Sequence, residues 1–149
     1  MNHPDKTNLR TPDIENVNVT DFDAMSSPEE IHARVPLSDK ATQTVMQGRE
    51  ALRNILDRKD HRLFVVVGPC SIHDPVAGLD YAHRLKKLAD EVGDTLQIIM
   101  RVYFEKPRTT VGWKGYINDP FMDDSFQVNV GMEKARDFLL QVNELGLPA

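Results

Sequence analysis

The run Leu63-Phe64-Val65-Val66-Val67, closed by Gly68-Pro69, decides how this chain folds. It holds five apolar residues, three of them valine, with no polar residue between them. A continuous apolar run of this length, bounded by turn-forming residues, is typical of a β-strand that is covered on both faces. Strands of that kind belong to parallel sheets, so the run predicts an α/β fold.

A second strand and several helices are expected around this run. Residues 96–102 (LQIIMRV) form another apolar stretch that predicts a buried strand. Ser27, Pro28 and Glu30 have the spacing of a capping box that opens a helix. Apolar residues at helical spacing predict four helices, over 28–34, 38–58, 75–93 and 132–145. In the third, we expect the inward face to carry Ala77, Tyr81, Leu85 and Leu88.

The order strand, helix, strand, helix calls for right-handed parallel crossovers. Two parallel strands cannot form a stable sheet by themselves, because their outer edges are left uncovered. A (β/α)₈ barrel typically needs about 250 residues, so two βα units would supply about a quarter of one. We therefore predict an α/β chain holding the first two βα units of a (β/α)₈ TIM barrel, preceded by a helical amino-terminal extension. An open doubly wound sheet fits the same pattern. The expected units are residues 1–60, the arm and its helices, and residues 61–149, an incomplete start of the barrel.

Composition excludes several classes of function. The 18 basic and 23 acidic residues give a net charge of -5, which argues against a nucleic-acid-binding or anionic membrane-binding surface. No apolar run approaches the roughly 18 residues that a membrane span requires. The polar, acid-containing amino terminus does not match a secretory signal, and the single cysteine, Cys70, cannot form an intrachain disulfide. We expect a cytoplasmic protein.

Residues 101–115 carry the strongest chemical signal in the chain. In parallel α/β folds, ligand sites lie at the carboxyl ends of strands, where this segment starts. Thr109 adds a hydroxyl donor, and four cations fall within fourteen positions: Arg101, Lys106, Arg108 and Lys114. The segment is suited to a small phosphorylated dianion. A solvated loop, with its cations paired to Glu105, Asp119, Asp123 and Asp124, is the other interpretation.

The segment 68–74 (GPCSIHD) follows the first strand and should lie at the same edge of the sheet, where the carboxyl ends of the strands meet. Cys70 as a thiolate could bind a divalent transition metal, and His73 offers a nitrogen ligand three positions later. A catalytic metal usually takes three protein ligands, so one cysteine and one histidine do not complete a site. A small, inert cysteine at a strand end remains the alternative.

Two segments, GPCSIHDP (68–75) and MRVYFEKPRTTVGWKG (100–115), closely resemble the signatures of 3-deoxy-D-arabino-heptulosonate 7-phosphate (DAHP) synthases. The resemblance is to the bacterial class with an aromatic-amino-acid-regulated barrel. It extends from about residue 37 to residue 149 and includes INDPFMDDSFQVN (117–129). On this basis the solvated loop and the inert cysteine are no longer the favoured interpretations.

The resemblance implies a (β/α)₈ barrel that condenses phosphoenolpyruvate with erythrose 4-phosphate to give DAHP and phosphate, the first step of the shikimate pathway. It implies that Cys70 is a ligand of a divalent metal such as manganese, iron or zinc. Arg101 and Lys106 resemble the catalytic contacts to phosphoenolpyruvate. Arg108 and Thr109 resemble the contacts to erythrose 4-phosphate, and Lys114 is a further candidate for substrate binding.

The region before the first strand resembles the extension that joins subunits in this class, as a dimer or tetramer, and that helps bind an aromatic amino acid effector. It is most similar to the tyrosine-sensitive type. The family's remaining metal ligands lie beyond residue 149, so we expect the 149-residue chain alone to be inactive. A non-catalytic anion-binding or regulatory module derived from the synthase is the alternative function. A barrel aldolase with a Schiff-base lysine is a third, which borohydride trapping would reveal.

Overall fold

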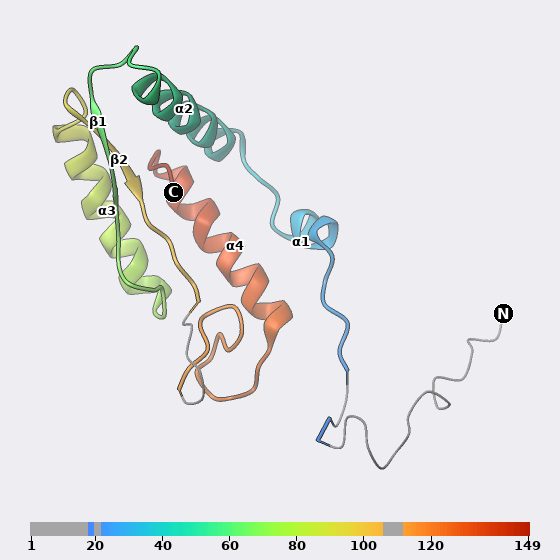
Figure 1. Cartoon of the computed structure of the whole chain (residues 1–149). Helices are drawn as coiled ribbons and strands as arrows, with labels where there is room; N and C mark the ends of the chain where they lie inside the picture. The colour runs from blue at the N-terminus through green and yellow to red at the C-terminus, as the bar shows by residue number, and fades with distance from the viewer. Residues whose placement is uncertain (1–17, 20–21, 106–111) are drawn as a thin grey trace.

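The computed structural model describes residues 18–19, 22–105 and 112–149. Two parallel strands and four helices make up this part of the chain, and α4 lies between the sheet and α1 (Figure 1). In chain order the elements are α1 Pro28–Arg34, α2 Asp39–Leu56, β1 Leu63–Val67, α3 Pro75–Glu91, β2 Leu96–Met100 and α4 Val128–Glu144. The expected alternation of strands and helices is confirmed.

The two strands pair in parallel, with Leu63 opposite Leu96 and Val67 opposite Met100. Beyond the paired residues, the Arg101 amide donates to the Val67 carbonyl at 2.9 Å. On the other edge of β2, the Met100 amide donates to the Pro148 carbonyl at 2.8 Å. Because successive amides of a strand point to opposite edges, the segment after α4 lies along the edge of β2 that faces away from β1.

Side chains of β2, α3 and α4 form the hydrophobic core. Phe138 and Val142 of α4 contribute to it, as do Ala82 and Leu85 of α3 and Ile98 and Met100 of β2. Two residues outside these elements complete it, Ile72 after β1 and Leu147 after α4. Burial of these side chains against one another fixes α3 and α4 on the sheet.

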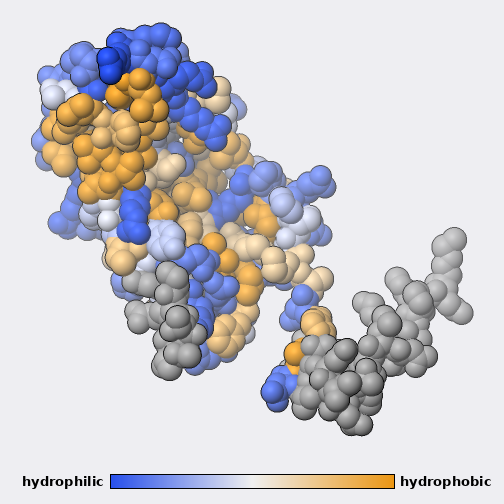
Figure 2. All heavy atoms as spheres, in the orientation of Figure 1, coloured by the Kyte–Doolittle hydropathy of each residue, from blue (hydrophilic) through white to orange (hydrophobic). Residues whose placement is uncertain are grey.

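The strand β1 differs from its prediction. Leu63 is 67% exposed and Val66 is 55% exposed, and the hydrophobic surface over β1 is visible in Figure 2. Within the described residues β1 has a strand partner only on its β2 side. The expectation of a strand covered on both faces is therefore wrong for this chain, although the parallel pairing that it implied is correct.

Three helices, α1, α2 and α3, begin directly after a capping side chain. In α1 the Glu30 amide donates to the Ser27 hydroxyl, and the Ser27 amide donates to the Glu30 carboxylate, which completes the capping box. Ser38 caps α2, and Asp74 caps α3 ahead of Pro75. Among the helices of the described part, none combines the length and apolar character needed to cross a membrane.

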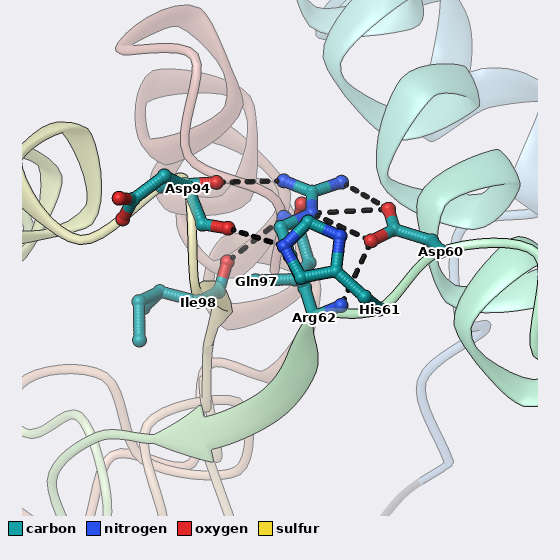
Figure 3. A network of polar contacts seen from close by, with 7 residues as sticks. Asp60, His61, Arg62, Asp94, Gln97 and Ile98 are labelled. Carbon is teal, nitrogen blue, oxygen red and sulfur yellow. Dashed lines mark hydrogen bonds and ion pairs between the residues drawn. The ribbon is translucent and has the colours of Figure 1, made fainter.

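A polar network joins the starts of the two strands (Figure 3). The Arg62 guanidinium donates to both carboxylate oxygens of Asp60, and its Nη1 donates to the Gly93 carbonyl at 3.1 Å. His61 Nε2 lies 3.1 Å from the Asp94 carbonyl oxygen. Hydrogen bonding to Arg62 lowers the pKa of Asp60 from 3.8 to about 2. These contacts hold the segment that enters β1 against the segment that enters β2.

Candidate functional site

The carboxyl ends of β1 and β2 form the rim on which the candidate residues lie. Arg101 follows β2 directly, and its Nη1 donates to the Pro69 carbonyl at 2.7 Å, next to Cys70. A Cβ at Gly68 would lie 2.2 Å from the Arg101 carbonyl oxygen, so the two backbones can approach this closely only because residue 68 is glycine. The structure therefore brings the Cys70 loop and Arg101 together, as the parallel-sheet rule predicts.

Arg101 lies just past the strand rather than inside it, and it is exposed. Its guanidinium carbon is 5.1 Å from the centre of the Tyr103 ring, within the range of a cation–π contact. The hydrogen bond to Pro69 and the contact with Tyr103 orient the guanidinium at the rim while it stays accessible to an anion. The strand expected over 96–102 included Arg101, where burial of its charge would have cost free energy, and an exposed side chain avoids that cost.

Cys70 is exposed and lies on the loop between β1 and α3. The loop is fixed by the Ile72 amide, which donates to the Tyr103 carbonyl at 2.7 Å. His73 is exposed on the same loop. Yet the described residues contain no group of three or more histidine, cysteine, aspartate or glutamate side chains that could hold a metal ion. Cys70 can supply one thiolate ligand, and the described residues do not complete the set.

The remaining candidate residues lie farther along the chain. Lys106, Arg108 and Thr109 fall outside the described residues. Lys114 is described and is half-buried. Its backbone carbonyl accepts a hydrogen bond from Asn118 Nδ2 at 3.4 Å. Of the candidate anion-binding side chains, the structure thus places Arg101 at the rim and Lys114 in the loop that follows β2.

Residues 112–127, which we call the site loop, lead from this rim to α4. Glu105 and Gly115 form an antiparallel bridge, and the Tyr116 amide donates to the Phe104 carbonyl at 2.8 Å. Asn118 Nδ2 donates to the Glu105 carboxylate at 2.9 Å. These bonds hold the site loop against residues 104 and 105, in the chain that leaves β2.

A buried aspartate organises the second half of the site loop. Asp119 is 2% exposed, and its carboxylate lies 3.4 Å from the Asp123 amide and 3.3 Å from the Asp124 amide. Its backbone carbonyl accepts a hydrogen bond from Trp113 Nε1 at 2.7 Å. Hydrogen bonds from Ser125 hold the pKa of Asp123 below its usual range. N–H groups of the loop thus donate to Asp119 and Asp123, two of the four acids that the solvated-loop interpretation paired with the cations.

Sequence reasoning missed several residues that shape this site. Tyr103 contacts Arg101, while Asn118 and Asp119 fix the site loop. Asn-Asp-Pro at 118–120 is a turn signal, since these residue types hydrogen-bond to nearby backbone, and it could have indicated an ordered turn. The sequence pattern does not identify the partners, because Glu105 lies 13 positions away from Asn118.

Comparison with known proteins places this geometry in a family. A family model described as the DAHP synthetase I family matches residues 34–148. The Tyr-sensitive phospho-2-dehydro-3-deoxyheptonate aldolase of Escherichia coli K12 is 51% identical over 135 residues, which cover 91% of this chain and 38% of that protein. The Phe-sensitive protein of the same strain is also 51% identical over 135 residues.

A solved structure gives the same result. The phospho-2-dehydro-3-deoxyheptonate aldolase of Francisella tularensis SCHU S4 aligns with a TM-score of 0.81 and 43% sequence identity. The alignment covers 88% of this chain and 38% of that one, so the chain spans well under half the length of these relatives. Since the family model takes in both strands, the rim between them and the site loop, the chain belongs to the DAHP synthetase I family.

Proposed function

We propose that this chain is part of a DAHP synthase, a transferase that condenses phosphoenolpyruvate with erythrose 4-phosphate. The proposal is carried by one observation: within the region that matches the family, the exposed Arg101 guanidinium lies beside the Cys70 loop at the carboxyl ends of two parallel strands. This is the rim on which parallel α/β enzymes bind anionic substrates. The corresponding fold is a (β/α)₈ barrel, begun by β1, α3, β2 and α4.

In the proposed reaction, C3 of phosphoenolpyruvate attacks the aldehyde carbon of erythrose 4-phosphate and forms a carbon–carbon bond. Water adds at C2, and phosphate leaves as the C2–oxygen bond breaks, so the products are DAHP and inorganic phosphate. Arg101 and Lys106 hold phosphoenolpyruvate, Arg108 and Thr109 hold erythrose 4-phosphate, and Lys114 is a further substrate-binding residue. Fixed cations of this kind stabilise the negative charge that builds up during the transfer. The contact with Tyr103 keeps Arg101 oriented before substrate arrives.

Cys70 is proposed as one ligand of a divalent metal ion, such as manganese, iron or zinc. An exposed thiol on a fixed loop suits this role, because thiolate is a ligand for such ions. A bound ion would polarise the aldehyde as a Lewis acid. The described residues supply this donor but not a full ligand set.

Residues 1–60 are proposed as an extension that joins subunits into a dimer or tetramer and contributes to an effector site for an aromatic amino acid. Relatives named as Tyr-sensitive, Phe-sensitive and Trp-sensitive support an effector of this class. The equal identities to the Tyr-sensitive and Phe-sensitive proteins do not favour one over the other. Residues 61–149 begin the catalytic barrel, and the proposed location is the cytoplasm.

The test is an assay of DAHP formation and phosphate release with the protein purified from its native source, after its intact mass has been measured. We expect a mass well above 16.9 kDa and turnover of both substrates. We expect Arg101→Ala to lower kcat/KM for phosphoenolpyruvate by roughly 100-fold or more, since it removes a charged, bidentate donor. Arg84→Ala, which removes an exposed arginine paired with Asp80 on α3, is the matched control and should leave kcat/KM unchanged.

Two results would contradict the proposal. If Arg101→Ala keeps the wild-type kcat/KM for phosphoenolpyruvate, Arg101 does not bind that substrate. A mass of 16.9 kDa together with no turnover would favour the non-catalytic anion-binding module instead.

A further inference from the structure

Residues 22–35, which we call the strap, run beside α4 on the side that faces away from the sheet (Figure 1). Asn129, in the first turn of α4, holds the strap at two points. Its Oδ1 accepts a hydrogen bond from the Ser26 amide at 2.8 Å, and its Nδ2 donates to the Ala24 carbonyl at 3.2 Å. Farther along, Arg136 Nε donates to the Val35 carbonyl at 2.6 Å. Arg34 also forms an ion pair with Glu133.

The strap is held by these polar contacts rather than by a large apolar interface. Ile31, at 7% exposure, is the buried side chain of α1, whereas Met25 is 68% exposed. A groove of about 440 Å³ remains between the strap and the start of α4, lined by residues that include Met25 and Phe126. Segments with few buried apolar contacts open at a small cost in free energy, so the strap belongs to the least stable part of the fold.

The first turn of α4 is also the anchor of the site loop. A Cβ at Gly131 would lie 2.0 Å from the Ile117 carbonyl oxygen, so helix and loop are in direct backbone contact. Phe126 and Asp124 hold positive φ angles of 49° and 59° as the loop enters α4. Aspartate adopts such an angle readily, whereas a bulky residue such as Phe126 keeps it only where its surroundings enforce it. The loop's conformation therefore depends on where the first turn of α4 lies.

A continuous set of contacts runs from the strap to the rim. Asn129 joins the strap to α4, Gly131 joins α4 to Ile117, and the neighbouring Asn118 joins the loop to Glu105. We propose that the strap is a conformational device that stabilises the site loop through Asn129 and the first turn of α4, so that its release loosens residues 112–127. This inference does not depend on the proposed activity. It concerns the order of the loop, whichever anion binds there.

Hydrogen exchange of the full-length protein, followed by mass spectrometry, tests the coupling. Ile31→Ala loosens the strap from its own side, away from the loop, and Asn129→Ala removes both side-chain hydrogen bonds from the α4 side. We expect each variant to raise exchange in residues 22–35 and also in residues 112–127, by roughly three- to tenfold. Gln141→Ala is the matched control, because its side-chain amide donates to Asp137 on the same helix and not to the strap.

Three outcomes would overturn the proposal. In the first, exchange rises in the strap while residues 112–127 keep the wild-type rate. In the second, the loop responds to Asn129→Ala but not to Ile31→Ala, which would reveal a local effect of residue 129 on its neighbours. In the third, α3 and β2 lose protection to the same degree as the loop, which would mean that the strap is not a separate unit of stability.

Discussion

Gly131 and Ile117 make a contact that no other residue type permits at position 131. A Cβ there would lie 2.0 Å from the Ile117 carbonyl oxygen and 2.7 Å from its carbonyl carbon. Backbone atoms cannot move aside as the end of a flexible side chain can. This single close approach sets the distance between α4 and the site loop.

We expect Gly131→Ala to lower the free energy of unfolding by about 1–3 kcal/mol, because the added methyl group forces backbone shifts that outweigh the better helix propensity of alanine. Urea unfolding of the full-length protein measures the change. Gly93→Ala is the control, since its Cβ would meet the Ala89 carbonyl oxygen at 3.1 Å and needs only a small adjustment. Equal stability of the two variants would show that the loop can move away from α4.

Asp60 and Arg62 make stability depend on pH in the acid range. The pKa of Asp60 is about 2 in the folded chain against an ordinary value of 3.8, chiefly because of the side-chain hydrogen bonds from Arg62. A lowered folded-state pKa gives stability that is fully present above pH 3.8 and is lost as the pH falls through about 2. The melting temperature of Asp60→Asn should therefore lie below that of the wild type at neutral pH.

The difference in melting temperature should shrink as the pH falls from about 4 to about 2. Scanning calorimetry across that range measures it. Asp57→Asn breaks the more exposed ion pair with Lys59 and should change the melting temperature less at neutral pH. A constant difference at every pH would rule out titration of Asp60 as the cause.

At the scale of the elements, local signals predicted the starts of helices well. The capping box at Ser27 and Pro75 after Asp74 identify the first residues of α1 and α3, since a cap involves only neighbouring residues. The start of α4 was placed four residues late, at 132, because its N-cap, Gln127, makes no side-chain capping bond. The second helix ends at Leu56 rather than 58, and Arg58 has a φ of 60°.

Which stripe of a helix is buried could not be predicted from spacing alone. In α3, Leu85 is buried as expected, but Ala77 and Leu88 are exposed. Gly78 is buried instead, because the Phe138 ring of α4 packs where its Cβ would be, 2.8 Å away. For the site, the parallel-sheet rule placed Cys70 and Arg101 on one rim. The bonds of Asn118 and Asp119 depend on tertiary structure and were missed.

The cap of α2 provides a test at this scale. The Ser38 hydroxyl accepts a hydrogen bond from the Ala41 amide at 3.1 Å. We expect Ser38→Ala to lower the free energy of unfolding by about 1 kcal/mol, because an N-terminal amide of the helix loses its acceptor. Ser38→Asp should restore most of the loss, since aspartate caps as well as serine does. Urea unfolding separates the cases, and an equal loss in both variants would argue against a capping role.

At the scale of the whole molecule, the part of the chain that the structure describes has an uncovered apolar surface on β1. Leu63, Phe64, Val65 and Val66 of β1 are all exposed, and among the described residues β1 has no strand partner beyond β2 (Figure 2). An exposed hydrophobic edge strand without a charge is a site for association with another chain. The relatives that the chain matches are longer, since it spans 38% of the Tyr-sensitive protein.

We expect the 149-residue chain to self-associate in a concentration-dependent way. Val66→Lys should shift it toward the monomer, because a charge on the strand must be desolvated when another chain packs on it. Val76→Lys is the matched control, since Val76 is an exposed valine on α3 rather than on the strand. Sedimentation velocity measures the distribution, and equal behaviour of the two variants would place the association surface elsewhere.

The parallel pairing of Val67 with Met100 limits where residues can be inserted in this chain. One extra residue inserted within 63–68 would move every later side chain of β1 to the opposite face of the sheet. It would also shift Cys70 along the chain and so away from its place beside Arg101. The same insertion in the turn that enters β2, near Asp94, leaves both strands intact and is accommodated by a longer connection. In members of this family, insertions and deletions should therefore occur between α3 and β2, and β1 and β2 should contain none.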